Sequence, residues 1–346
     1  MPTVAVIIPF YNGSRFIERS LRSVRDQTVQ PDALVVVDDG SRHDEAAALQ
    51  GIAAKYGATV ITQPNGGQGS ARNTGVASVD TDYICFLDQD DFYLDHHIET
   101  LLSAVPDRAG GFGWAYADLM GADQDGNVFR SGVVGDASVH PKRDVFQMIG
   151  ADMMVLPSAS IISRSAFLAV GGFDPQFKGY EDDDLFLRLF RRGYRNVFIP
   201  EPVTVWCIHS ASTSYSIHMS RSRFRYFKKL HAMFPSDETK HWFVLRDVLI
   251  PRFHRTFISE AFSAVVRPHS PTGKRLSAHR DEILGIAQEY QSIVEADMFV
   301  PRRVKAKIAA QVAVLRSGSP IFAETALLAT QVAANGRRAL AALLRP

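Results

Sequence analysis

The sequence predicts an α/β domain with a mixed, mostly parallel sheet and helices on both faces, followed by a helical C-terminal extension. Short apolar runs alternate with helical patterns over residues 1–100, and strand signals stop after Ser220. We therefore expect a first domain over residues 1–220 and a helical region over 221–346. A chain of 346 residues, 46% hydrophobic and 22% charged, can bury a core of this size.

The first strands are expected to be short, apolar and closed by turn residues. We place them at residues 4–8, 34–37, 60–62 and 83–87. Between the first two, Ile17, Leu21 and Val24 fall on one face of a helix. This strand–helix alternation predicts a parallel sheet whose ligands bind at the carboxyl ends of the strands.

From about residue 110 onward the pattern loosens into glycine-rich and aspartate-rich loops. Further strands are expected at residues 114–117, 160–163, 197–199 and 203–208, with a helix starting near Glu181. We interpret residues 111–220 as the second half of the first domain.

Asp88, Asp90 and Asp91 directly follow the fourth expected strand. Mg²⁺ is often held by one or two carboxylates together with substrate phosphates, so this cluster suits a metal diphosphate. Three neighbouring carboxylates also repel one another unless a cation neutralises them. A capped turn is the alternative, because aspartate is common after strands and at helix starts.

Other strand ends carry polar residues that suit a nucleotide. Asp38 and Asp39 follow the second strand and can accept hydrogen bonds from a base or ribose. Tyr11 and Asn12 follow the first strand and could stack on and bond to a base. Arg72 opens a helix, where a cation and free N–H groups suit a phosphate. Each also fits an ordinary turn or helix start.

Two further candidates lie in the second half. Four acids, beginning at Glu181 and Asp182, head a helix, which the helix dipole alone would favour. One of them could instead act as a general base toward a hydroxyl. His209 follows the strand expected at 203–208, where it could bind a metal or hydrogen-bond a loop.

Taken together, these clusters resemble glycosyltransferase family 2, the inverting transferases with the GT-A fold, over roughly residues 3–215. Their order and spacing match the family throughout. The matching segments are residues 6–12, 36–41, 69–75, 86–91, 171–174 and 181–182.

The resemblance implies that residues 1–110 form the nucleotide-sugar half of the first domain and residues 111–220 its acceptor half. It also implies specific roles on the donor side. Pro9, Tyr11 and Asp39 would surround the base, with Asp39 bonded to a pyrimidine ring, and Arg72 would face the nucleotide. Asp88 would lie near the ribose.

It also implies the metal ligand and the base. Asp90 would hold the Mn²⁺ or Mg²⁺ that bridges the diphosphate, and Asp182 would be the catalytic base. His209 matches a histidine that many members carry, and we take it as a second metal ligand. The roles of Glu181, Asp91 and Asp38 stay open.

The implied activity is that of a metal-dependent inverting hexosyltransferase, which moves a sugar from a nucleotide-diphosphate sugar, favouring UDP, to a saccharide or lipid-linked hydroxyl. Cell-envelope polysaccharide or glycolipid biosynthesis is the expected setting, and nucleic acid is not an expected partner. The alternatives are a non-catalytic sugar-nucleotide-binding protein and a sugar-nucleotide nucleotidyltransferase. Against the latter, no glycine-rich loop with arginine or lysine follows the first strand.

Two cysteines in apolar runs and no long apolar segment favour a cytoplasmic protein. In the tail, Val304, Ile308, Val312 and Leu315 form an amphipathic stripe beside basic residues. Such a helix could lie peripherally on the inner face of a membrane. The alternative is that the stripe packs on the catalytic domain or mediates a homo-oligomer.

Overall fold

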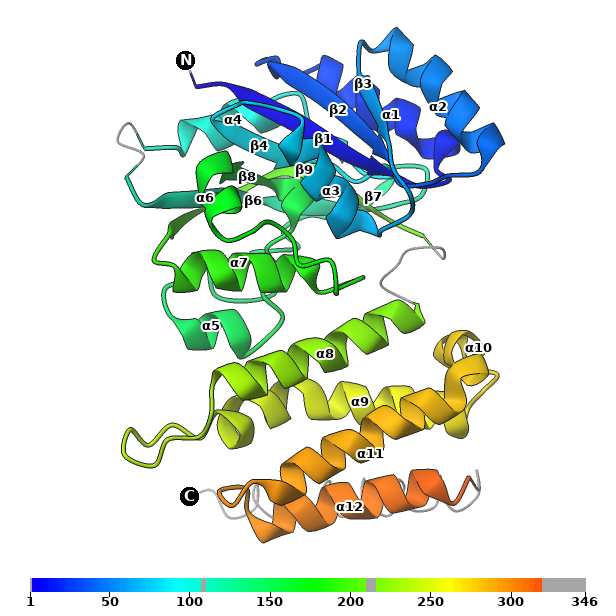
Figure 1. Cartoon of the computed structure of the whole chain (residues 1–346), viewed down its shortest axis with the longest axis vertical. Helices are drawn as coiled ribbons and strands as arrows, with labels where there is room; N and C mark the ends of the chain where they lie inside the picture. Colours follow the sequence, from blue (N-terminus) through cyan, green and yellow to red (C-terminus); the bar gives the residue numbers. More distant parts are fainter. Residues whose placement is uncertain (1, 107–109, 210–215, 319–346) are drawn as a thin grey trace. The chain divides into compact units, whose positions relative to one another are not determined.

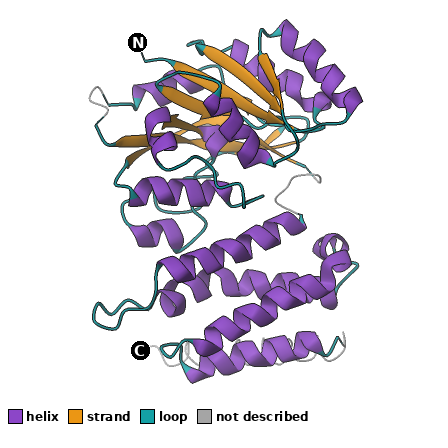
Figure 2. Ribbon diagram, in the orientation of Figure 1, coloured by secondary structure: helices purple, strands orange, loops and turns teal. Residues whose placement is uncertain are grey.

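The computed structural model describes residues 2–106, 110–209 and 216–318. The chain divides into two compact units, residues 1–212 and 213–346. Figures 1 and 2 show that the first contains the sheet and that the second is built of helices.

The first unit is organised around one sheet of nine strands. Its order is β3-β2-β1-β4-β8-β6-β9-β5, and β7 pairs with β6. The strands are β1 (Val4–Phe10), β2 (Ala33–Asp38), β3 (Thr59–Thr62), β4 (Tyr83–Phe86), β5 (Phe92–Tyr93), β6 (Phe112–Asp123), β7 (Val128–Arg130), β8 (Ser160–Ser163) and β9 (Arg195–Ile208). The pairings among β1 to β4 are parallel, whereas β8 runs antiparallel to both β4 and β6.

Helices cover both faces of this sheet, so the predicted fold class is confirmed. They are α1 (Ser14–Arg25), α2 (His43–Lys55), α3 (Gln68–Ala77), α4 (His97–Ser103), α5 (Val145–Ile149), α6 (Arg164–Ala169) and α7 (Glu181–Arg191). Successive side chains of a strand point to opposite faces. Val6 and Ile8 accordingly share a core with α1, α2 and α4, while on the other face Trp114 packs against Phe186 of α7.

Helix α3 approaches β1 unusually closely. A Cβ atom at Gly75 would lie 2.4 Å from Ile7 Cγ2 and 3.3 Å from Val37 Cγ2, so only glycine fits there without displacing a strand side chain. This contact holds α3 against the sheet, and Gln68 and Arg72 on that helix reach the carboxyl ends of the strands.

The prediction of two separate strands at residues 197–199 and 203–208 was wrong. The structure has one strand of 14 residues, β9, which runs through both segments. Pro200 and Pro202 lack the N–H that a ladder needs, and the sequence therefore indicated a break. The register of the β6–β9 pairing shifts beside Asp118, and this irregularity lets the strand continue past the prolines.

The second unit contains α8 (Ile217–Met233), α9 (Ile250–Val265), α10 (Pro271–Leu276), α11 (Arg280–Ala296) and α12 (Arg302–Arg316). Its core is aromatic, with packed rings of Phe224, Phe227, Phe253, Phe257 and Tyr290.

The amphipathic stripe of the tail lies on α12, and its apolar side faces inward. Ile308, Val312 and Leu315 are buried, because α12 packs on α9 and α11 within the second unit. The basic residues beyond position 318 lie outside the described residues. Within the described part of the chain, no helix combines the length and apolarity needed to cross a bilayer.

Candidate active site

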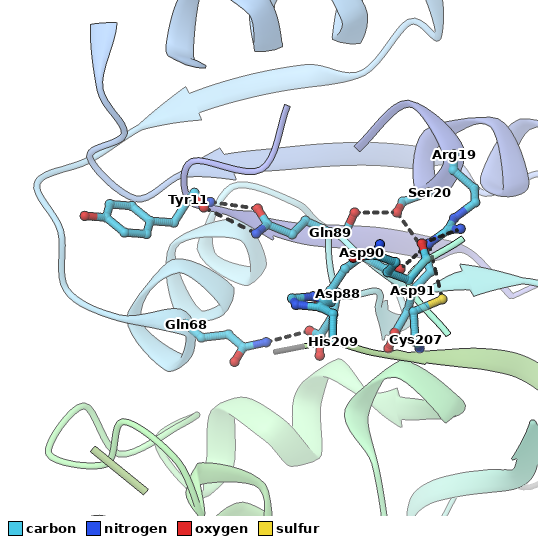
Figure 3. Close-up of polar contacts among 11 residues, drawn as sticks. Tyr11, Arg19, Ser20, Gln68, Asp88, Gln89, Asp90, Asp91, Cys207 and His209 are labelled. Carbon is cyan, nitrogen blue, oxygen red and sulfur yellow. Dashed lines mark hydrogen bonds and ion pairs between the residues drawn. The ribbon is translucent and has the colours of Figure 1, made fainter. Parts of the chain in front are cut away.

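The carboxyl ends of β1, β2 and β4 meet at one edge of the sheet. Phe10 pairs with Asp38 and Ile7 pairs with Phe86, so the residues that follow these strands are neighbours. Figure 3 shows the resulting cluster around Asp88 and Asp90. The sequence prediction that polar strand ends converge at one edge is confirmed.

Asp90 and His209 form the closest acid–imidazole pair of this edge. Asp90 Oδ2 lies 2.6 Å from His209 Nε2, although the two residues are 119 positions apart. The imidazole ring stacks on Phe16, with ring centroids 5.1 Å apart. Burial, reinforced by the charge of Asp88, raises the pKa of Asp90, and the bond to His209 opposes that shift.

This pair suits a divalent cation. A carboxylate oxygen and an imidazole nitrogen that point at the same small volume can both become ligands, and a nitrogen donor suits Mn²⁺ better than Mg²⁺. No group of three or more acidic, histidine or cysteine side chains among the described residues could hold a metal. The remaining ligand positions would therefore fall to a diphosphate and water.

Arg72 is a buried cation between two carboxylates. Only 2% of its side chain is exposed, and its guanidinium lies 2.6 Å from Asp88 Oδ1 and 3.2 Å from Glu181 Oε1. Burial alone would lower the pKa of Arg72, but Asp88 and Glu181 more than offset this and raise it. Arg72 thus joins the end of β4 to the start of α7.

Asp88 and Glu181 each have a second hydrogen-bond donor besides Arg72. Gln68 Nε2 donates to Asp88 Oδ1 over 2.6 Å, and the N–H of Gly179 donates to Glu181 Oε2 over 2.9 Å. Both carboxylates are fixed in place, which preorganises the edge of the site.

Asp182, the predicted base, lies next to this network in the first turn of α7 and is half-buried. Its Oδ1 accepts the N–H of Asp183 over 2.9 Å. Burial, followed by the charges of Glu181 and Asp183, raises the pKa of Asp182 well above its ordinary value. A raised pKa suits a group that must take up a proton during the reaction.

Asp91 is a structural member of the run. It is 1% exposed, and its Oδ1 accepts the N–H of Cys207 over 2.8 Å, which ties the end of β4 to β9. Burial, together with Asp90 and Asp88, raises its pKa well above the ordinary value. Its Oδ1 is therefore engaged by the backbone of β9, and the role that the sequence left open for Asp91 stays open.

Asp38 and Asp39 shape the loops that surround the predicted nucleotide site. Asp38 Oδ1 accepts the N–H of Ser41 over 3.0 Å. The Asp39 carboxylate accepts the N–H groups of Gly66 and Gly67 over 2.8 and 2.7 Å and so holds the glycine-rich loop before α3. A base bonded to Asp39 would share it with this loop.

The residues after β1 differ in how freely they can meet a ligand. Pro9 is buried within the strand, and Tyr11 is 50% exposed. Asn12 has a positive φ of 48°, and its Oδ1 accepts the N–H of Arg42 over 2.9 Å, which links it to the loop after β2. The exposed ring of Tyr11 is accessible to a ligand, whereas the side chain of Asn12 bonds to the backbone.

Four further residues of the cluster were not predicted from the sequence. Gln89 bonds the backbone of Tyr11, and Gln68 bonds Asp88. Ser20 and Arg19 contact the backbone of the 88–91 run from α1. Ser20 could have been found, because it is a polar residue within the buried face formed by Ile17, Leu21 and Val24. Nothing local distinguishes the other three.

The fold matches that of GT-A-like glycosyltransferases. Residues 5–128 match the model of Glycosyl transferase family 2.

Several known proteins are similar to the chain. The succinoglycan biosynthesis protein ExoW of Rhizobium meliloti is 41% identical over 103 residues, which are 28% of this chain and 32% of that protein. The chain thus spans about a third of that relative's length. The structure of Staphylococcus aureus TarS 1–349 in complex with UDP-GlcNAc has a TM-score of 0.62 at 15% identity, covering 94% of this chain and 92% of that one. The mannosyltransferase PcManGT of Pyrobaculum calidifontis, in complex with GDP-Man and Mn²⁺, has a TM-score of 0.50 at 17% identity, covering 91% and 86%.

Proposed function

We propose that this protein transfers a sugar from a nucleoside-diphosphate sugar, preferably a UDP-sugar, to an acceptor hydroxyl with inversion of the anomeric carbon. The observation that carries the proposal is the buried link from Asp88 through Arg72 to Glu181. This link holds a carboxylate at the donor edge and the start of the helix that carries Asp182 in one fixed arrangement. A donor site joined in this way to a base is what a direct transfer requires.

Each residue has a definite part in such a reaction. The oxygen of the acceptor hydroxyl attacks the anomeric carbon while Asp182 accepts the hydroxyl proton. The nucleoside diphosphate leaves from the opposite face. Tyr11 stacks on the base, Asp39 bonds to it, and Asp88 lies toward the ribose. Arg72 stabilises the diphosphate side electrostatically.

Asp90 and His209 would hold the Mn²⁺ or Mg²⁺ ion. When bound, the ion neutralises negative charge on the diphosphate oxygens. That PcManGT was solved with Mn²⁺ supports metal use in a protein of similar fold.

A setting in extracellular or cell-envelope polysaccharide synthesis is proposed because the relative ExoW is named for succinoglycan biosynthesis. A saccharide or lipid-linked acceptor fits this setting. A cytoplasmic location, contact with the membrane surface and assembly into a homo-oligomer remain predictions of the sequence.

The test is a thermal-shift panel of UDP, GDP, CDP and dTDP, each with MnCl₂ and with EDTA, followed by donor turnover with the matching nucleotide sugars. We expect the largest shift with UDP and Mn²⁺, and release of UDP from a UDP-sugar. Binding without any turnover toward water or added acceptors would favour a non-catalytic sugar-nucleotide-binding protein. Release of pyrophosphate from a sugar phosphate and UTP would favour a nucleotidyltransferase.

A further inference from the structure

Asp90 and His209 come from distant parts of the chain, so something other than local sequence must align them. Asp90 follows β4 and His209 follows β9, and neither residue is inside a regular element. Strands β4 and β9 are not neighbours in the sheet, but β5, which begins two residues after Asp90, pairs antiparallel with Val205 and Thr204 of β9. This pairing brings the two segments to one edge of the sheet, and side chains that bind both segments fix the residues just before β5 and at the end of β9.

Arg19 of α1 contacts both segments at once, as Figure 3 shows. Its Nη2 donates to the carbonyl oxygen of Asp90 over 2.8 Å and to Cys207 Sγ over 3.2 Å, two residues before His209. Its Nη1 donates to the carbonyl oxygen of Gln124 in the β6–β7 turn over 3.2 Å. The guanidinium also lies over the Phe92 ring, 4.9 Å from its centroid.

Ser20 binds the same run from the next position of α1. Its Oγ lies 2.8 Å from the carbonyl oxygen of Gln89 and 2.7 Å from that of Asp91. The single hydroxyl proton is therefore shared between these two acceptors. Arg19 and Ser20 thereby engage the carbonyls of three successive residues. The N–H of Cys207 donates to Asp91 Oδ1 and so connects the same run to β9.

The chemistry of arginine explains why it occupies position 19. Its planar fork presents several donors in fixed directions, and hydrogen bonds from a charged donor are about twice as strong as neutral ones. Lysine would bring the same charge but a single donor atom, which cannot reach Asp90, Cys207 and Gln124 together. A role in simply filling space would not need this fork.

We propose that Arg19 is a positioning residue that, with Ser20, holds the Asp90 backbone and the end of β9 together, so that the Asp90–His209 pair is preorganised for a divalent cation. This inference rests on the proposed function, because it assigns the pair to a metal. Arg19 itself contacts neither the Asp90 carboxylate nor the His209 ring by any hydrogen bond found among the described residues.

The experiment measures Mn²⁺ binding rather than turnover. Free Mn²⁺ is followed by its electron paramagnetic resonance signal while MnCl₂ is titrated into the full chain with saturating UDP. We compare wild type, Arg19→Lys, Ser20→Ala and the control Arg22→Lys, which changes an exposed residue of the same helix. Groups that orient metal ligands typically contribute about 10- to 100-fold in metal affinity, and we expect Arg19→Lys to weaken Mn²⁺ binding by about 10-fold.

A second readout separates positioning from general damage. UDP affinity in EDTA and the melting temperature of Arg22→Lys should match wild type, and Arg19→Lys should keep its UDP affinity in EDTA. Arg19→Lys that binds Mn²⁺ as tightly as wild type overturns the inference and leaves the proposed function intact. If Arg19→Lys does not fold, Ser20→Ala decides by the same criterion. Wild type that binds UDP but no Mn²⁺ overturns the metal assignment and this inference with it.

Discussion

The two acidic runs of the first unit, Asp88–Asp91 and Glu181–Asp184, look alike in sequence but are used differently. Each run gives one carboxylate to Arg72, namely Asp88 and Glu181.

Each run also has a buried member that stabilises the fold. Asp91 bonds the backbone of Cys207, and Asp184 pairs with Arg188 over 2.8 Å.

The runs diverge in Asp90 of the first and Asp182 of the second. Both carboxylates lie near like charges, Asp90 near Asp88 and Asp182 near Glu181 and Asp183, but Asp90 also contacts the imidazole of His209. The added nitrogen donor suits Asp90 to a cation, whereas the like charges around Asp182 suit it to a proton. The difference between the two runs therefore lies in their neighbours rather than in their composition.

Among the substitutions that test this comparison, replacement of the proposed base should cause the largest loss of turnover. General-base catalysis contributes about 10²- to 10⁴-fold, so Asp182→Asn should lose transferase turnover by about 10³-fold or more. Its affinity for UDP with Mn²⁺ should stay close to that of wild type. Turnover and UDP binding measured on the same preparation check this. Comparable turnover by Asp182→Asn would assign the base elsewhere.

Removal of the Arg72 guanidinium, which bonds to both runs, should lower the stability of the protein. Arg72→Met leaves Asp88 and Glu181 without their buried partner, and breaking a buried ion pair costs about 3–5 kcal/mol of unfolding free energy. Urea unfolding gives the value. The matched control is Arg164→Met, because Arg164 pairs with Asp80, whose side chain is fully exposed, and a much smaller loss is expected. Equal losses of unfolding free energy in the two variants would show that the Arg72 bridge stabilises the protein no more than an exposed ion pair does.

Within the first run, Asp90 and Asp91 should respond differently. Asp90→Asn should lower turnover by about 10²-fold, because electrostatic stabilisation of a leaving group is worth this much or more. His209→Ala should lose less. Asp91→Asn keeps an oxygen for the Cys207 N–H and should change turnover little. Steady-state rates at several Mn²⁺ concentrations test this order, and a larger loss in Asp91→Asn would contradict it.

The pH dependence of turnover should report the raised pKa of Asp182 in the second run. Asp182 acts as a base only when deprotonated, and burial with neighbouring charges raises its pKa. Turnover should therefore rise with pH, and the rise should lie above the ordinary titration range of an aspartate. Glu181→Gln removes a like charge, so its rise should move to lower pH. An unmoved or upward-shifted profile would contradict the electrostatic account.

Much of the first unit could be predicted from the sequence because its signals are local. The apolar runs of β1, β2 and β4 each end in polar residues, and parallel pairing brings those ends together without further information. The acids at the start of α7 were equally visible. Interpretation of β9 failed because Pro200 and Pro202 are usually strand breakers, and only the partner strand reveals the irregularity that accommodates them.

The partners within the site were not predictable in the same way. The pairing of Asp90 with His209 and that of Arg72 with Glu181 join residues more than a hundred positions apart. A single sequence gives the identity of each side chain but not which of several nearby acids receives a given cation. Arg19 was missed for this reason, since its acceptors are backbone carbonyls and one thiol.

The glycine that seats α3 on β1 has a consequence for how this chain can vary. With Ile7 Cγ2 only 2.4 Å from where a Cβ would stand, alanine at position 75 would push the helix, and Arg72 with it, away from the strands. Room for that methyl group could come only from a smaller residue at position 7. Positions 7 and 75 are thus expected to covary among descendants of this sequence, a large residue at one requiring glycine at the other.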